Sequence, residues 1–177
     1  LFRNRPCVTI PDDHDIGHGN LWGEGGKISA SPAGDDGGYF YHHEYVKMVE
    51  RCQTSHLPDA YDPTPVLQGI GVYYTSLNIG GVDFAIIEDR KFKSGPAGKI
   101  PQQGPRPDHI RNPDYDPKSI DLPGLQLLGE RQLTFLKEWG RKQDGVSMRA
   151  VLSQTGFCGG AHRHATHRLL GGLRADR

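Results

Sequence analysis

The part of this sequence best suited to chemistry is a run of four ionisable residues, Asp12, Asp13, His14 and Asp15. Carboxylates crowded this closely repel one another unless cations lie beside them. Their oxygens favour Ca²⁺, Mg²⁺, Mn²⁺ or Fe, and the neighbouring imidazole suits Fe or Zn. A metal pair can activate water and bind phosphoryl oxygens, while the imidazole protonates the leaving alkoxide. The run therefore predicts a metal-dependent site for phosphate-ester hydrolysis.

The same run also has a simpler interpretation as a turn. Asp side chains often cap turns through nearby backbone N–H groups, so Asp12 and Asp13 could do this while His14 lies on the surface. His18 and Asn20 follow in a glycine-rich loop, and ionisable groups that gather in this way favour a functional site. On the residues alone, both interpretations stay open.

A second candidate cluster lies near the end of the chain, where His162, His164 and His167 form an H-x-H-x-x-H pattern. Neutral imidazoles bind Zn or Fe well. Arg163 and Arg168 lie within or beside the pattern, and their charges oppose cation binding. We therefore favour a solvated basic loop here and keep metal binding as the alternative.

The segment before the acidic run sets where the carboxylates would lie. Residues 7–10 are a short β-branched stretch between Pro6 and Pro11, and we expect them to form a buried strand. Such a strand would put the carboxylates at the carboxyl edge of a sheet. Open α/β folds place their sites at that edge.

The remaining elements are expected in an order typical of an α/β protein. They are a helix over residues 41–55, strands over 72–77 and 82–88, a helix over 130–142 and a strand over 148–152. Asn78, Gly80 and Gly81 between the first two strands predict a hairpin turn or a short loop. The first helix is expected to bury the side that carries Tyr41, Tyr45, Met48, Val49 and Cys52. The second is expected to bury Leu133, Leu136, Phe135 and Trp139. This order implies one layered α/β domain.

Composition limits the class of protein. A chain of 177 residues is long enough for one domain, and its 24 Gly and 13 Pro predict long irregular loops, the longest over residues 94–124. Because 21 basic residues balance 21 acidic ones, no overall field attracts nucleic acid, which argues against a stable nucleic-acid partner. The apolar runs are too short for a membrane span. The three cysteines form no CxxC pair of the kind that holds structural zinc.

Four stretches together resemble one known family. DDHDIGHGNLWGEGG (residues 12–26) resembles the DDHD/E-x-x-x-(G)N block of the PhoD-like alkaline phosphatase and phosphodiesterase family, a branch of the calcineurin-like metallophosphoesterases. FAIIEDRKFK (84–93), LLGERQLTFLKEW (127–139) and LSQTGF (152–157) resemble later blocks of that family, in the same order. The resemblance spans nearly the whole chain, and its first block is the most specific.

The resemblance implies an incomplete calcineurin-like fold, a layered α/β sandwich of mixed β-sheets flanked by helices. It implies that Asp12, Asp13 and Asn20 are metal ligands and that His14 faces the leaving oxygen. Arg90 matches a basic residue that contacts either the substrate phosphate or a structural carboxylate. Two or more ions of Ca, Fe, Zn or Mn and a small phosphate mono- or diester substrate are implied as well.

Other blocks of that family have no counterpart in this sequence. Acidic segments are expected before its first residue, and a Gly-Asp-x-His segment is expected near its end. We therefore interpret residues 1–177 as a partial catalytic domain with a loop-rich insertion at about 94–124, which could lack activity on its own. Family members are often exported, but we recognise no signal sequence here. The alternatives are a non-catalytic or Ca²⁺-binding α/β domain and another metal-assisted hydrolase of the same fold.

Overall fold

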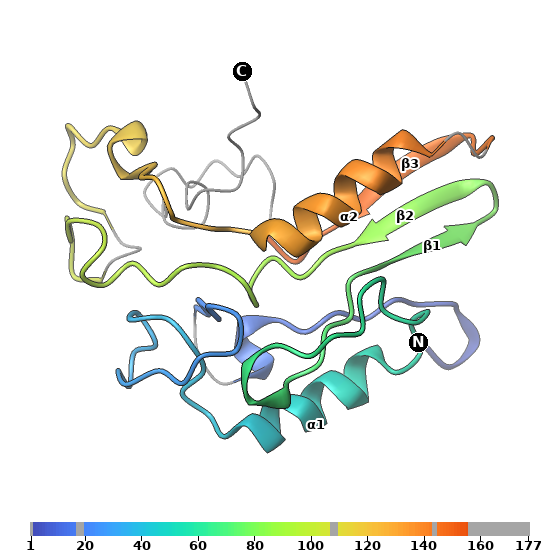
Figure 1. Cartoon of the computed structure of the whole chain (residues 1–177), viewed down its shortest axis with the longest axis horizontal. Helices are drawn as coiled ribbons and strands as arrows, with labels where there is room; N and C mark the ends of the chain where they lie inside the picture. Colours follow the sequence, from blue (N-terminus) through green and yellow to red (C-terminus); the bar gives the residue numbers. More distant parts are fainter. Residues whose placement is uncertain (1, 17–19, 107–109, 143–144, 156–177) are drawn as a thin grey trace.

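The computed structural model describes residues 2–16, 20–106, 110–142 and 145–155 (Figure 1). Within these ranges the chain has an α/β fold with one mixed three-stranded sheet and two α-helices. The helices are α1 (His43–Thr54) and α2 (Gly129–Arg141), and the strands are β1 (Thr75–Ile79), β2 (Val82–Ile86) and β3 (Met148–Leu152). Short 3₁₀ turns are η1 (Phe2–Asn4), η2 (Asp13–Asp15), η3 (Leu67–Gly69) and η4 (Pro117–Ile120).

The sheet has the order β1-β2-β3 and combines both pairing directions. β1 and β2 form the expected antiparallel hairpin, joined by Gly80 and Gly81 at φ +61° and +82°. Two positive φ values in a two-residue loop match the twist of a hairpin, and glycine reaches them without steric cost. β3 is parallel to β2, with Leu152 opposite Ile86. The carboxyl ends of β2 and β3 therefore meet at the same edge of the sheet.

α2 covers β2 and β3 in Figure 1. Its buried side chains are Gln132, Phe135 and Trp139, and Leu133 and Leu136 pack against the same core. The helix and most of its predicted buried side are thus confirmed. The core between α2 and the sheet also contains Tyr74, Ala85, Ile87 and Leu128.

α1 lies with the amino-terminal loops in the lower half of Figure 1, away from the sheet. The helix is confirmed, and Val49 packs against a core as predicted, but the rest of its predicted buried side was wrong. Val46 and Glu50 are buried, whereas Tyr45, Met48 and Cys52 are exposed and Tyr41 precedes the helix. Val46 packs in a second core with Ile16, Leu21, Tyr39 and Ile70.

The predicted buried strand over residues 7–10 was also wrong. These residues form no strand within the described part of the chain, and Cys7 and Thr9 are exposed. The Thr9 hydroxyl donates to the Gln53 carbonyl at 2.5 Å, and the Thr9 amide donates to the His56 ring at 3.3 Å. Thr9 therefore lies against the end of α1. The flanking prolines favour extended backbone but supply no partner strand.

The expected irregular stretch over residues 94–124 is confirmed for its described part, whose helical structure is the single turn η4. It is packed, because Ile110 and Ile120 are buried against Ile100 and Tyr115. In the part of the chain that the structure describes, no helix is long and apolar enough to cross a membrane.

Candidate functional site

Residues 12–15, the acidic turn, form η2 and its amino-terminal cap. The Asp13 amide donates to the Asp12 carboxylate at 2.6 Å, and the Asp12 amide donates to the Asp15 carboxylate at 2.9 Å. This is a capping box, in which two side chains satisfy the orphan amides of one helical turn. The simpler interpretation of the sequence therefore describes the backbone correctly. It leaves the role of the buried carboxylate unexplained.

Asp13 carries that buried carboxylate and is only 3% exposed. Its Oδ1 lies 3.0 Å from an Nη atom of Arg90, a residue just beyond β2. A buried carboxylate requires such a partner, because an unpaired charge away from water is costly. The structure thus brings together Asp13, which the resemblance implies as a metal ligand, and Arg90, for which it implies contact with either the substrate phosphate or a structural carboxylate.

Gln154 completes a closed network. Arg90 Nε donates to Gln154 Oε1 at 2.6 Å, and Gln154 Nε2 donates to Asp12 Oδ1 at 2.7 Å. Because β2 and β3 are parallel, Arg90 and Gln154 follow the same edge of the sheet. We call Asp12, Asp13, Arg90 and Gln154 the acidic network. Sequence analysis did not identify Gln154 as a site residue. Nothing in the sequence shows that β2 and β3 pair in parallel, which is what brings Gln154 next to Arg90.

The backbone around Arg90 is fixed from two sides. The Gly23 amide donates to the Arg90 carbonyl at 3.0 Å, and a Cβ on Gly23 would lie 2.4 Å from the Lys91 carbonyl oxygen. On the other side, Asp89 accepts from the Thr155 amide at 2.7 Å and from the Ser153 hydroxyl at 3.1 Å. The loops that carry Arg90 and Gln154 are therefore held against each other.

The charges of Asp12 and Asp13 are coupled. Burial, assisted by the hydrogen bond with Asp12 and opposed by Arg90, raises the pKa of Asp13 to about 6. The hydrogen bond with Asp13 lowers the pKa of Asp12, and Arg90 acts in the same direction. Near pH 5 the pair therefore holds one proton, mostly on Asp13.

His14 lies at the margin of the acidic network. The His14 side chain is 74% exposed, and its Nε2 is 3.9 Å from Asp13 Oδ2. An imidazole in this position is accessible to a substrate. Asn20 is half-buried. His162, His164, His167 and Cys158 lie outside the described residues.

A buried ion triad (Glu50, Glu88 and Lys91) lies behind the acidic network. Lys91 Nζ is 2.7 Å from Glu50 Oε1 and 2.5 Å from Glu88 Oε2, and it also donates to the Gly71 carbonyl. Lys91 is 3% exposed and Glu88 1%. Burial raises the pKa of Glu50 to about 7, although Lys91 opposes the shift. The triad joins α1 to the segment that follows β2.

A small cavity is shared by the triad and the acidic network. Its lining includes Asp12, Arg90, Glu50, Glu88 and Lys91. The free volume inside is about 10 Å³, which leaves room for no more than about one water molecule. An ester bound by these residues would therefore lie on the outer side, where His14 is exposed.

The acidic network offers ligand atoms of the type that a hard metal ion prefers, but too few of them to complete a metal centre. Asp12 and Asp13 offer carboxylate oxygens, whereas a hydrolytic metal centre takes three or more protein ligands. Within the described ranges, no group of three or more His, Cys, Asp or Glu side chains could hold a metal ion. Any complete centre would need ligands from beyond these residues.

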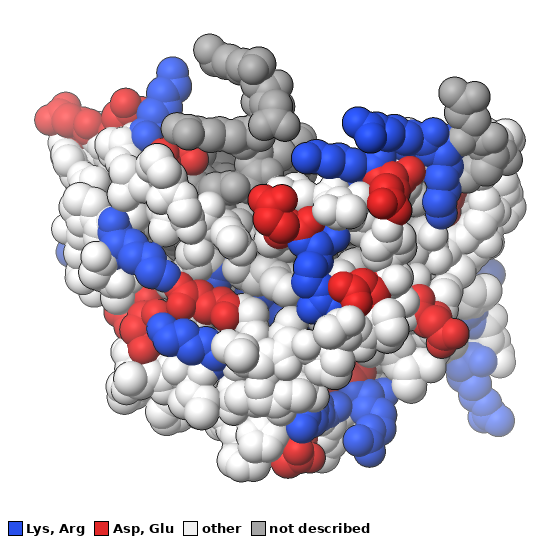
Figure 2. Space-filling view, in the orientation of Figure 1, with Lys and Arg blue, Asp and Glu red and all other residues white. Residues whose placement is uncertain are grey.

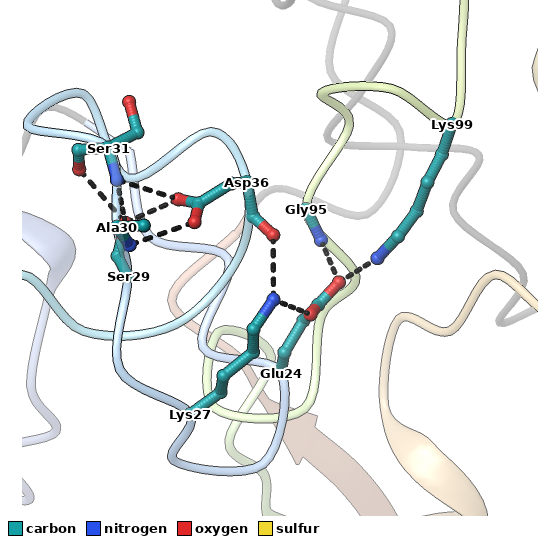
Figure 3. Close-up of polar contacts among 8 residues, drawn as sticks. All are labelled: Glu24, Lys27, Ser29, Ala30, Ser31, Asp36, Gly95 and Lys99. Carbon is teal, nitrogen blue, oxygen red and sulfur yellow. Dashed lines mark hydrogen bonds and ion pairs between the residues drawn. The ribbon is translucent and has the colours of Figure 1, made fainter.

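Other acidic side chains of the glycine-rich region close loops (Figure 3). Glu24 accepts from the Gly95 amide at 2.9 Å and pairs with Lys27 at 3.3 Å and with Lys99. Asp36 accepts from the Ser29 hydroxyl and from the amides of residues 30 and 31. Both carboxylates therefore have a structural role in holding the loops. The acidic turn remains as the candidate site.

The surface charge agrees with the neutral composition. On the described part of the face in Figure 2, acidic and basic side chains are interspersed, without a broad area of one sign. Such a surface gives no long-range attraction for a polyanion.

Comparison with known proteins adds no assignment. No family model matches this chain, and no curated protein and no solved structure matches it. The geometry of the acidic network and the sequence resemblance therefore carry the functional argument.

Proposed function

We propose that this chain is part of a metal-dependent phosphoesterase of the PhoD-like, calcineurin-like type that hydrolyses phosphate mono- or diesters. The proposal rests chiefly on the ion pair between Asp13 and Arg90, 3.0 Å long. The two residues come from separate segments. The resemblance implies that Asp13 is a metal ligand and that Arg90 contacts either the substrate phosphate or a structural carboxylate. The cap itself uses the Asp12 and Asp15 side chains, so the buried Asp13 carboxylate and its arginine partner are features beyond the cap.

Asp12 and Asp13 are the residues that would hold an ion in this enzyme, with Asn20 as a further oxygen donor. Gln154 and Arg90 orient the two carboxylates through the hydrogen bonds of the acidic network. A bound ion would polarise the phosphoryl oxygens and lower the pKa of an attacking water. The remaining ligands are expected from parts of the protein beyond the described residues.

His14 is the proposed proton donor to the leaving oxygen. It is next to Asp13 in the chain, and its side chain is 74% exposed, so a substrate can reach it. General acid catalysis of this kind contributes about 10²- to 10⁴-fold to a rate. Arg90 has the role of orienting Asp13, to which it is already bound.

The fold is compatible with this proposal. Arg90 and Gln154 follow the carboxyl ends of parallel strands, the edge at which α/β proteins place ligands. A mixed sheet with helices is also the coarse plan of the calcineurin-like sandwich. We propose that the described sheet and helices are part of that larger sandwich, with the stretch at about 94–124 as an insertion.

Metal content and turnover test the proposal. Purified protein is incubated with Ca²⁺, Fe³⁺, Zn²⁺ or Mn²⁺, dialysed, and analysed for bound metal and for hydrolysis of p-nitrophenyl phosphate and its bis ester. We expect two ions per chain and turnover that Asp13→Asn abolishes. Asp114→Asn, a change of an exposed carboxylate elsewhere, serves as the control and should leave both unchanged.

A second function is favoured by a specific observation, the capping box at Asp12 and Asp15. In this alternative the acidic turn and Arg90 serve only to hold the loops together, and the chain is a non-catalytic domain that binds one Ca²⁺ or no metal. One ion or none, together with no turnover of either ester, would favour this alternative.

A further inference from the structure

An exposed row of aromatic side chains lies beside the acidic turn. Phe40, Tyr41 and Tyr45, the aromatic row, are 50%, 41% and 39% exposed. The ring centroids of Phe40 and Tyr41 are 5.6 Å apart in edge-to-face geometry, and those of Tyr41 and Tyr45 are 5.5 Å apart. The rings therefore form one continuous surface. Single exposed apolar residues are ordinary, but contiguous patches often mark binding sites.

Tyr45 links the aromatic row directly to the acidic turn. Its hydroxyl donates to the Asp15 carbonyl at 3.1 Å. The preceding residue, His14, is the exposed imidazole that the proposed function places at the leaving oxygen. The aromatic row therefore begins at the acidic turn itself, one residue along the chain from the proposed proton donor.

The chain on both sides of the aromatic row is anchored. Tyr39, just before it, is 2% exposed, and its amide and carbonyl bond to Lys27 and Ser29 at 2.7 and 3.0 Å. Just after it, the His42 ring accepts from the Glu44 amide at 3.3 Å as the cap of α1. A surface held in this way loses little conformational freedom on binding, which favours affinity.

We propose that the aromatic row is the subsite for the organic group of the ester, and that this group is planar and aromatic. The inference rests on the proposed phosphoesterase function and names its substrate class. Aromatic side chains stack on planar rings through their π faces, whereas a glycerol or alkyl group offers no such face. The Tyr45 hydroxyl holds its ring at the turn, and Tyr41 and Phe40 extend the surface outward.

Binding of two stable phosphonates tests this subsite without requiring turnover. Phenylphosphonate and methylphosphonate share the anionic group and differ in the ring, so calorimetric affinities for the full chain isolate the contribution of stacking. We expect phenylphosphonate to bind at least about fivefold more tightly, as stacking on one aromatic side chain implies. Tyr41→Ala should remove the preference, and Tyr41→Phe, which keeps the ring, should retain it.

Two further variants serve as controls. Ile79→Ala truncates a similarly exposed apolar side chain on the hairpin and should leave the preference unchanged. Tyr45→Phe removes only the hydroxyl that binds the Asp15 carbonyl and should weaken the preference less than Tyr41→Ala. Circular dichroism of each variant shows whether it remains folded, and Phe40→Leu replaces Tyr41→Ala if that variant does not.

The outcomes separate the subsite from the proposed function. Equal affinity for the two phosphonates, no binding of either, or a preference that survives Tyr41→Ala would overturn the subsite, even if p-nitrophenyl phosphate is hydrolysed. A preference that depends on Tyr41, in a protein that hydrolyses no ester under any metal condition, would support the subsite as a ligand site. That result would reject the proposed phosphoesterase function and leave the subsite standing.

Discussion

The guanidinium of Arg90 lies 3.0 Å from the buried carboxylate of Asp13 and joins the segment after β2 to the acidic turn. The Arg90 and Asp13 side chains are 12% and 4% exposed, so water screens the pair little. Removing one partner of such a pair leaves a charge without compensation in a poorly solvated place. Stability and protonation at the site should therefore depend on this contact.

Replacing Arg90 with methionine should destabilise the fold. Asp13 would keep its burial but lose its counter-charge, and we expect a loss of about 3 kcal/mol at pH 8, as for other broken buried pairs. Below pH 5 the loss should shrink, because Asp13 is then protonated. Urea unfolding at both pH values measures the effect. Arg111→Met, at an exposed position, is the control, and an equally small loss in both variants would contradict the prediction.

Gln154→Ala should open the acidic network without removing a charge. It deletes the bonds to Arg90 and Asp12, which are 2.6 and 2.7 Å long. We expect a loss of about 1–3 kcal/mol in free energy of unfolding, because two partially buried groups lose their partner. The same change at Gln126, an exposed side chain, should cost far less. Equal values for the two variants would mean that the network is not formed in solution.

The stability of the protein should fall as pH rises through neutrality. The folded-state pKa of Glu50, about 7, lies above its ordinary value of 4.5, so the folded protein binds this proton more tightly. That stabilisation is fully present below pH 4.5 and is lost as pH rises through 7. Asp13 shifts in the same direction, but only up to about 6. The interval from pH 6 to 7.5 therefore reports mainly on Glu50.

Glu50→Gln should flatten this part of the pH profile, because glutamine has no proton to lose. The wild-type protein should lose about 1 kcal/mol more than the variant between pH 6 and 7.5. Glu88 and Lys91 face Glu50 in both proteins, so the difference isolates its titration. Parallel profiles for the two proteins would show that Glu50 stays ionised throughout.

Gly23→Ala should disturb the backbone that positions Arg90. The added Cβ would lie 2.4 Å from the Lys91 carbonyl oxygen, so one of the two segments must shift. Such overpacking costs about 1–3 kcal/mol. At Gly140, in α2, an added Cβ meets nothing within 4 Å, so alanine there should stabilise by about 0.5 kcal/mol through helix propensity. Thermal unfolding should therefore show a lower melting temperature for Gly23→Ala and a higher one for Gly140→Ala. A Gly23→Ala variant as stable as the wild-type protein would contradict the close approach.

Local patterns predicted much of the fold because they depend on neighbouring residues. The Gly80–Gly81 turn identified the hairpin, and the apolar spacing around Phe135 and Trp139 identified α2 and its buried side. The predicted buried side of α1 was mostly wrong because the helix buries the charged residue Glu50, which apolar spacing does not indicate. Its partner Lys91 lies far along the chain, and no local pattern shows that the two meet.

The candidate site was predicted in part for the same reason. The run of ionisable residues indicated Asp13, and the family resemblance indicated Arg90. The structure places the two in one ion pair. Gln154 enters only through the parallel pairing of β2 and β3, a tertiary relationship. The strand expected over residues 7–10 failed because β-branched residues between prolines also suit an extended segment against a helix.

Metal binding by the acidic turn beside Arg90, as proposed, can be observed by titrating Mn²⁺ into isotopically labelled protein. Paramagnetic broadening of backbone NMR signals locates the ion whether or not the chain is catalytically active. We predict that signals of residues 12–15, 90 and 154 broaden first, and that Asp12→Asn combined with Asp13→Asn abolishes the effect. Broadening centred on Glu24 and Asp36, or unchanged by the double substitution, would contradict the claim.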